Sequence, residues 1–399
     1  MKLSLKKVVS LLVVIVLFSS FDCNDKSGVS QKLVIENTLQ FDRSEIVTIN
    51  LKEYKGLAEI KIFRNLLVKD EKGNLLVTQL IDSNQDGTPD ELLFQVTVPA
   101  LSKMIYTVFS DLKSIQKSPT SLLATFGRFV PERIDDFAWE NDKVAFRTYG
   151  PEAQRLTEAG RTDGTLSSGI DIWLKKVNYS IIDSWYAKNV VSPGYYHVEH
   201  GEGYDPYHVG SSRGNGGTGI WEKDSLYISK NYVKYRIIAT GPLRTIFELD
   251  YAPWSKYGVR ETKRISLDLG SNFSKFENAI SSNDKIPNYT LGITLHKEQG
   301  VAKINAQKGI FRYWEPIDNS FVGEGIVIDP IVVKTAINNH SKSVDQSQIL
   351  VVTEPKNNKL IYYVGFAWLK SGQVQSVEDW DMMLEKQSKL IQNPLIIKI

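Results

Sequence analysis

The sequence is poor in cysteine, carries little net charge and lacks several familiar catalytic signatures. One cysteine among 399 residues cannot form an internal disulfide. A formal net charge of +2 creates no basic field, so nucleic acid is not expected as a partner. No Gly-x-Ser-x-Gly elbow is present, which argues against an α/β-hydrolase esterase. What remains is a chain long enough for two or three ordinary domains, or for one large β domain with a smaller partner.

The N-terminus predicts export. Residues 1–22 combine lysines with an apolar run that is too short to span a membrane comfortably, followed by small residues, as in a signal peptide. Cys23 follows at once and resembles the lipidated cysteine of a bacterial lipoprotein, although Asp22 replaces the small residue usual before it. The alternative is a simple secretory signal with an incidental cysteine. We therefore expect an exported protein, a periplasmic or outer-membrane lipoprotein that touches the membrane only through its anchor.

Short strand-like segments dominate the rest of the chain. Aromatic residues make up 11% of the sequence, which fits a β-rich protein and also a carbohydrate binder, where flat rings stack on sugar faces. Residues 30–112 contain several short segments rich in β-branched and aromatic residues, separated by turn formers, and predict a small β-sandwich. The polar stretch 113–121 is the expected linker.

Residues 122–399 predict a larger all-β domain. In "LRTIFELDY" (243–251), apolar and polar residues alternate, so Leu243, Thr245, Phe247 and Leu249 share one face. Two helices are expected, one short at 181–189 and one C-terminal at 376–393. In the C-terminal helix, Ser376 and Asp379 form a capping-box pair ahead of an apolar stripe.

A glycine-rich stretch at 195–217 holds three of the five histidines. His197, His200 and His208 could act as acids or bases, because histidine titrates nearest to neutral pH. Together with Glu202 and Asp205 they could also bind a divalent metal such as Zn, although the spacing matches no strong metal signature. The third possibility is a polar loop held by internal hydrogen bonds. Long glycine-rich loops often carry function.

A second polar cluster lies at 132–151. An arginine beside a tyrosine, Arg147 and Tyr149, suits a site that grips a sugar carboxylate and moves a proton. Further substrate-binding candidates here are Asp136, Trp139 and Glu140, with Asp135 next to them. The alternative is a strand pair with solvated charges and a core tryptophan.

A third candidate is the acidic loop 82–92. Asp82, Asn84, Asp86 and Asp90 have the spacing of a calcium loop, but Leu93 occupies the position of the bidentate glutamate. An acidic hairpin turn is therefore the preferred interpretation over a Ca site.

Four long motifs carry a family resemblance: "RIDDFAWENDKVAFRTYGP", "GIDIWLKKVNYSIIDSWY", "YHVEHGEGYDPYHVGSSRGNGGTGIW" and "YYVGFAWLKSGQVQSVEDWDMML". From about residue 30 to the end, the chain resembles the bacterial family of domain of unknown function 4861. The resemblance implies an exported protein associated with polysaccharide degradation, often beside enzymes that process uronic acids. More loosely, residues 224–281 resemble the paired long strands of galactose-mutarotase-like supersandwiches, which implies a fold and a saccharide ligand but no reaction.

Three functions follow from these observations and resemblances. A β-eliminating lyase on acidic polysaccharides would use Arg147 or Arg213 to neutralise the uronate, a histidine as base, and Tyr149 or Tyr196 as acid. A glycoside hydrolase would instead use two carboxylates from the set Asp135, Asp136, Glu140, Glu202 and Asp205. A lipid-anchored saccharide-binding protein without turnover is the alternative to both.

Overall fold

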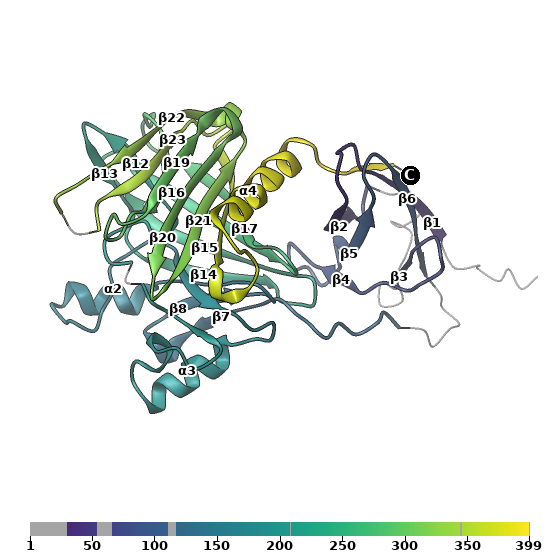
Figure 1. Ribbon diagram of the computed structural model, residues 1–399, viewed down its shortest axis with the longest axis horizontal. Coiled ribbons are helices and arrows are strands. Elements are labelled where there is room, and N and C mark those ends of the chain that lie inside the picture. Colours follow the sequence, from purple (N-terminus) through teal and green to yellow (C-terminus); the bar gives the residue numbers. More distant parts are fainter. Residues whose placement is uncertain (1–29, 54–65, 111–116, 208, 344, 399) are drawn as a thin grey trace, which may run out of the picture.

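The computed structural model describes residues 30–53, 66–110, 117–207, 209–343 and 345–398. Figure 1 shows a small β-sandwich beside a much larger β structure. The expected mostly-β fold is confirmed. The predicted signal peptide, Cys23 and His208 lie outside the described residues.

The small sandwich consists of two antiparallel sheets around a separate apolar core. One sheet has the order β25-β1-β6-β3 and the other β2-β5-β4. Their bounds are β1 Ser30–Glu36, β2 Arg43–Asn50, β3 Leu66–Lys69, β4 Thr78–Ile81, β5 Glu91–Val98, β6 Lys103–Ser110 and β25 Ile396–Lys398. Alternate residues such as Leu33, Ile49 and Phe94 are fully buried between the sheets, as a half-buried strand requires.

The end of the chain departs from the predicted domain limits. Residues 122–399 were expected to form one domain, but β25 pairs with β1, with Ile35 opposite Ile397. Arg43 of β2 donates from Nη1 to the Asn393 carbonyl at 2.7 Å. In Figure 1 the yellow C-terminal segment crosses from the large body to the small sandwich. The sequence shows no signal for this return, because three residues of strand are too few to reveal their partner.

The large sandwich has an eight-stranded antiparallel sheet in the order β14-β15-β16-β17-β24-β21-β20-β19. The bounds are β14 Tyr232–Ala239, β15 Arg244–Trp254, β16 Val259–Asp268, β17 Phe273–Ser281, β19 Val301–Asn305, β20 Ile310–Ile317, β21 Ser320–Ile328 and β24 Lys359–Trp368. Thr245, Phe247 and Leu249 face the core as predicted. Ile246, on the opposite face, is also buried, because Ile81 and Leu93 of the small sandwich cover it.

Two five-stranded sheets pack against the eight-stranded one and share its core. They have the orders β13-β12-β18-β23-β22 and β11-β10-β9-β8-β7, and an isolated parallel bridge between Ile170 and Gly214 links them. The bounds are β7 Phe126–Val130, β8 Asp136–Glu140, β9 Ala145–Thr148, β10 Asp171–Lys175, β11 Gly203–Tyr204, β12 Asn215–Glu222, β13 Ser225–Tyr227, β18 Tyr289–Thr294, β22 Val333–Asn339 and β23 Gln348–Thr353.

Both predicted helices are present: α3 at Ile182–Val191 and α4 at Val377–Gln392. Ser376 caps α4 by accepting from the Asp379 amide at 3.3 Å, while the Asp379 carboxylate accepts from the Gln375 amide. The helix α2, Pro151–Glu158, was not predicted. Trp380 of α4 packs directly against Gly323 of β21, and its ring occupies the space that a side chain at position 323 would need. No helix in the described ranges is long and apolar enough to cross a membrane.

The acidic loop 82–92 joins β4 to β5 as a hairpin. Asp82 accepts from the amides of Asp86 and Gly87, and Asp86 accepts from the Thr88 amide. Asp90 forms an ion pair with Lys52 at 2.6 Å. The carboxylates thus stabilise the turn, in agreement with the preferred interpretation.

Candidate active site

Strand alternation in β8, β9 and β10 separates two kinds of side chain. Phe137, Trp139, Phe146 and Ile172 face the main core. The intervening positions face α3 and the segment 195–207, and five of the eight side chains there are charged. The residues on this second face are Asp136, Ala138, Glu140, Ala145, Arg147, Asp171, Trp173 and Lys175. Buried charges require partners, and the sheet brings them together here.

Arg147 is the centre of a buried charge cluster. Its Nε donates to Asp171 Oδ2 at 2.9 Å, its Nη2 donates to Asp205 Oδ2 at 2.7 Å, and its Nη1 lies 3.6 Å from Asp136 Oδ2. Asp171 is the direct cross-strand partner of Arg147, whereas Asp205 arrives from the segment after α3. All four residues are buried. We call these four, with Tyr149 and Tyr196, the Arg147 cluster.

Aromatic rings enclose the guanidinium. Its Cζ lies 5.2 Å from the ring centroids of Tyr149 and Trp173 and 5.4 Å from that of Tyr196. The Tyr149 hydroxyl donates to Asp171 at 3.2 Å. Arg147 therefore has its nitrogens engaged by groups of the protein itself.

Burial shifts the proton affinities of the carboxyls in this cluster. It raises the pKa of Asp136 to about 6, against the opposing effects of Arg147 and Arg133. Burial and the nearby Asp171 carboxylate also raise the pKa of Asp205. One guanidinium does not balance three ionised aspartates, so the cluster favours holding a proton.

Tyr196 joins this cluster to an arginine that the sequence analysis did not select. Its hydroxyl oxygen accepts from Arg147 Nη1 at 3.3 Å and from Arg133 Nε at 3.1 Å. Arg133 is half-buried, and its terminal nitrogens make no hydrogen bond or ion pair with the described residues. The one feature of the sequence that could have identified Arg133 is its position in the same polar segment as Asp136.

His197 lies at the edge of the cluster and is open to solvent. Its Nδ1 lies 2.9 Å from the Asp205 carbonyl oxygen, which can only accept, so Nδ1 carries the hydrogen and Nε2 presents its lone pair. The side chain is 47% exposed, and Nε2 has no hydrogen bond within the described part of the chain. Partial burial lowers the pKa of His197, and Arg147 and Arg133 lower it further.

The other residues of the 195–217 stretch have structural contacts. His200 stacks on Tyr195 at 4.0 Å and bonds to its carbonyl through Nε2. Glu202 accepts from Tyr179 and from Trp185 of α3. The structure thus separates His200 and Glu202 from His197 and Asp205. The proposed three-histidine metal site includes His208, outside the described residues.

Three further candidates lie away from the cluster. Trp139 is in the main core and donates to Ser274 at 2.9 Å. Glu140 pairs with Lys175 at 2.6 Å and accepts from the amides of Ile181 and Ile182, so it holds the start of α3. Asp135 accepts from the Glu152 amide at 3.1 Å and so holds the start of α2.

Arg213 is inside the large sandwich rather than beside Arg147. It is fully buried and donates to Ser168 Oγ at 2.8 Å. Burial lowers its pKa to about 10, opposed by Glu261 on β16. A substrate carboxylate cannot reach this guanidinium without opening the core, so Arg213 is not a uronate ligand in this structure.

A second polar group, the His296 cluster, was missed by the sequence analysis. His296 follows β18, while Glu315 and Glu324 lie on β20 and β21 with their side chains toward the core. Their ligand atoms all lie within 4.8 Å of one another, and no other group of three such residues does so in the described ranges. Burial raises the pKa of Glu324 to about 8, opposed by His296 and reinforced by Glu315 and Asp171. Three separate elements contribute, so no local spacing could reveal it.

The segment 203–207 connects the two clusters. Asp205 binds Arg147, and two residues later the ring of Tyr207 stacks on His296 with 4.1 Å between centroids. The Tyr207 hydroxyl donates to Glu315 Oε1 at 2.6 Å. The two clusters therefore share one connecting loop and form one polar region of the fold.

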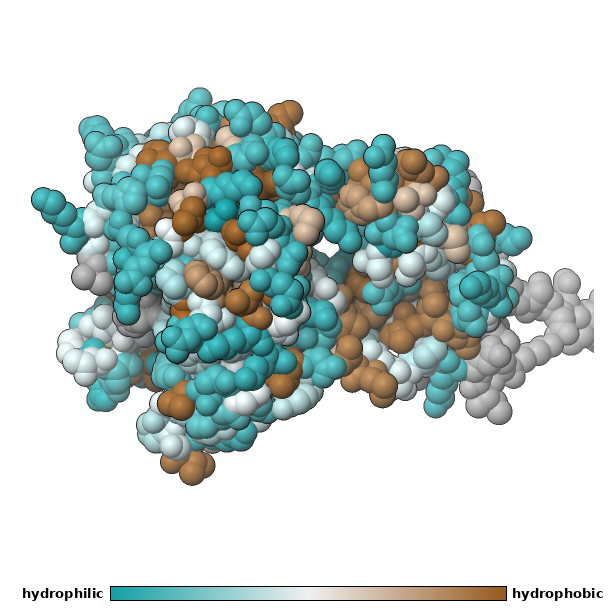
Figure 2. Space-filling model, in the orientation of Figure 1, coloured by the Kyte–Doolittle hydropathy of each residue, from teal (hydrophilic) through white to brown (hydrophobic). Residues whose placement is uncertain are grey.

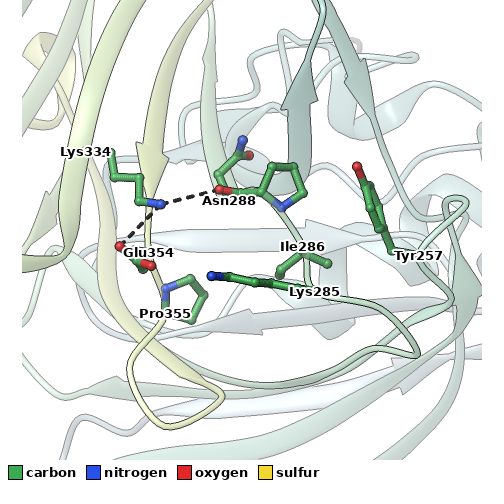
Figure 3. A pocket seen from close by; sticks show the side chains of 8 residues that line it. Tyr257, Lys285, Ile286, Asn288, Lys334, Glu354 and Pro355 are labelled. Carbon is green, nitrogen blue, oxygen red and sulfur yellow. Dashed lines mark hydrogen bonds and ion pairs between the residues drawn. The ribbon is translucent and has the colours of Figure 1, made fainter.

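Two surface cavities lie elsewhere. One, of about 330 Å³, is lined by Tyr257, Lys285, Asn288, Lys334 and Glu354, and Figure 3 shows Lys334 paired with Glu354 across it. The other, of about 340 Å³, is lined by Phe129 of β7, by Pro151 and by Tyr232, Val233, Lys234 and Tyr235 of β14. Neither contains a residue of the two clusters.

Comparisons with known proteins give a close relative and several distant solved structures. Uncharacterized protein P7 of Formosa agariphila is 41% identical over 389 residues, 96% of each chain. Two Enterococcus faecalis structures, a protein in glycosyl hydrolase family 38 and an alpha-mannosidase, align over 92% of this chain with TM-scores of 0.48 and 0.47 and identities of 10% and 9%. This chain spans about half the length of those two proteins.

The sequence model of one family, described as Domain of unknown function (DUF4861), matches residues 35–397. This range includes both five-stranded sheets, the eight-stranded sheet and nearly all of the small sandwich. The chain belongs to the DUF4861 family.

Proposed function

We propose that this protein is an exported carbohydrate-active enzyme that cleaves uronic-acid-containing oligo- or polysaccharides by β-elimination. The observation that carries the proposal is His197, a solvent-exposed imidazole whose Nδ1–H is fixed by the Asp205 carbonyl. Its lowered pKa keeps the ring neutral near pH 7, so Nε2 is available as a base.

The reaction assigns its tasks to two neighbouring groups. His197 Nε2 takes the C5 proton of the uronate, and the C5–H electron pair forms the C4–C5 double bond. The bond from C4 to the leaving oxygen breaks, and the protonated His197 passes its proton to that oxygen, because the Tyr196 hydroxyl is buried and does not reach the substrate. Arg133, whose terminal nitrogens have no described partner, neutralises the uronate carboxylate and stabilises the charge that develops beside it.

Arg147 takes a different part from the one the sequence suggested. It is buried and engaged by Asp171, Asp205 and Tyr196, so it has no free edge for a substrate carboxylate. It acts as a positioning residue. By binding the Asp205 side chain it fixes the carbonyl that orients His197.

Hydrolysis is the second candidate, and one observation favours it. Oδ2 of Asp171 and Oδ2 of Asp205 both accept from Arg147 Nη2, at 2.5 and 2.7 Å, so they lie close together. Retaining glycosidases hold their two carboxyl groups about 5 Å apart, and the raised pKa of Asp205 suits a general acid. Both carboxyls are buried, so hydrolysis requires the segment that carries Asp205 to open toward the substrate.

The first test follows ultraviolet absorbance of the C4–C5 unsaturated uronate on intact and lyase-digested acidic polysaccharides. A rise on intact chains is expected, and a fall on predigested oligosaccharides would instead identify hydrolysis of the unsaturated end sugar. If the trace is flat while calorimetry detects saccharide binding, the protein is a binder without turnover.

Variants then test the assigned roles. His197→Ala should lower kcat/KM at least about 100-fold, the usual scale of a general base, and His340→Ala, an exposed histidine on another loop, should not. The acid limb of the pH profile should lie below 6.5, since a proton on His197 removes the base. Arg133→Lys should raise KM for uronate substrates. A His197→Ala enzyme within tenfold of wild type would rule out this assignment.

Location is proposed on the sequence alone. A lipid anchor on Cys23 would hold the enzyme on a membrane surface outside the cytoplasm, where it can meet its polysaccharide substrate. Metabolic labelling with a radioactive fatty acid should mark the wild-type chain and not Cys23→Ser.

A further inference from the structure

We propose that His296, Glu315 and Glu324 bind one divalent transition-metal ion, with Zn²⁺ as the first ion to test. The inference rests on the contacts of these three residues and does not depend on the reaction proposed above. Imidazole and carboxylate groups are the ligands that Zn²⁺ takes in proteins, and three protein ligands leave a position open for water or substrate.

Glu324 is the strongest observation. Its side chain is 2% exposed, yet neither carboxylate oxygen has a hydrogen-bond partner among the described residues. Buried carboxyl groups are almost always bonded, because an unpartnered one loses its hydration without replacement. The described residues do not supply the missing partner, and the neighbouring ligands indicate a cation.

The approach of His296 to Glu315 indicates the same centre. Nδ1 lies 2.7 Å from Glu315 Oε1 and 3.9 Å from Glu324 Oε1. Despite the short distance, Nδ1 makes no hydrogen bond of acceptable geometry. Two ligands bound at about 2.1 Å to one tetrahedral ion lie about 3.4 Å apart, and the two distances from Nδ1 fall on either side of this value. Small side-chain adjustments would therefore bring the three atoms around one ion.

The surroundings hold the ligands in place. Tyr207 donates to Glu315 Oε1 at 2.6 Å and stacks on the His296 ring. Such outer contacts orient metal ligands and strengthen binding. A calcium ion is disfavoured because it takes oxygen ligands, whereas this set includes an imidazole nitrogen.

The structure offers a matched control in the same region. His340 and Glu298 form a similar His–Glu contact, Nδ1 to Oε2 at 2.5 Å, but both are largely exposed and no third ligand group converges on them. A real site and an incidental His–Glu contact should differ in metal binding, and the two can be compared in one protein.

The experiment uses the purified full chain, stripped with a chelator and titrated with Zn²⁺ against a chromophoric competitor. We expect one Zn²⁺ per chain, and at least 100-fold weaker binding in His296→Ala and in Glu324→Gln. His340→Ala should bind as wild type. Co²⁺ in place of Zn²⁺ should give a visible d–d spectrum that Glu324→Gln abolishes.

Circular dichroism and thermal unfolding in chelator establish that each variant is folded. Glu324→Gln changes one atom type and keeps the side-chain shape, so it serves if His296→Ala is unstable. No Zn²⁺ uptake by wild type, or equal uptake by wild type and Glu324→Gln, would overturn the inference. If wild type binds Zn²⁺ but shows no lyase activity, the result counts against the proposed reaction and leaves the metal site standing.

Discussion

The Arg147 cluster and the His296 cluster are neighbours with opposite bonding. Each aspartate around Arg147 has one oxygen in a hydrogen bond, to Arg147, Tyr149 or Tyr186, although the second oxygens of Asp136 and Asp171 have no partner. Neither oxygen of Glu324 has a partner among the described residues. A charged group whose partners are protein side chains contributes to the architecture, whereas one without partners awaits a ligand. This difference indicates that the His296 cluster, and not the Arg147 cluster, is the one to test for ligand binding.

The largest effect should come from removing the centre of the satisfied cluster. Arg147→Met leaves three buried carboxyls without their counter-charge and should cost about 3–5 kcal/mol in the free energy of unfolding. Urea unfolding followed by fluorescence measures it. Arg155→Met, which breaks an exposed pair with Glu152 on α2, should cost less than about 1 kcal/mol. Similar losses in both would mean that the Arg147 cluster does not stabilise the fold.

The second effect is a pH dependence of the free energy of unfolding, and it arises from Asp136. Its pKa of about 6 in the fold exceeds the unfolded value of about 3.9, so the native state binds this proton more tightly. The stabilisation is complete below about pH 4 and is lost as pH rises through 6, by at most about 3 kcal/mol. Asp136→Asn should remove this trend. Unfolding free energies of both proteins at pH 4, 5, 6 and 7 give the difference, and parallel curves would contradict it.

A smaller effect is expected in the unsatisfied cluster. In chelator, Glu324→Gln should change the unfolding free energy by less than about 1 kcal/mol, because the carboxylate makes no hydrogen bond that the substitution could break. With Zn²⁺ present, wild type alone should gain stability by mass action. Thermal unfolding with and without the ion tests both statements. A loss above 3 kcal/mol in chelator would show that Glu324 is a structural partner after all.

The smallest effect concerns the loop between the clusters. Tyr207→Phe keeps the stacking on His296 but removes the hydrogen bond to Glu315, and should cost about 1 kcal/mol. Zn²⁺ affinity should fall about tenfold, as for other outer contacts of metal ligands. Chemical unfolding and competitive titration provide the two values. Unchanged affinity would mean that Glu315 is oriented without Tyr207.

The sequence predicted what depends on local pattern. Alternation identified the strand faces of β15, and the capping pair located α4 within a residue at each end. It also placed Asp136, Arg147, Tyr149, Tyr196, His197 and Asp205 among the candidates, and these come together. Partners distant in sequence could not be predicted. Glu140 resembled a free acid because α3, which supplies its amide donors, is 40 residues away in the chain.

The His296 cluster shows the same limit more strongly. Glu315 and Glu324 are single charged residues at inward positions of strands that otherwise have a mostly apolar inward face, and His296 follows β18. Their proximity depends on how β18, β20 and β21 are placed across the sandwich. An inward glutamate such as Glu324 in an apolar strand is the one local signal. On the surface, Figure 2 shows hydrophilic side chains over most of the large body and gives no indication of this buried group.

The pairing of β25 with β1 has a consequence for the order of assembly. Translation delivers β1 long before Ile396–Lys398. The outer edge of β1 therefore stays without this partner while more than 350 residues follow it, and an unpaired edge can recruit other strands. The small sandwich is begun before the large one is made and is completed after it.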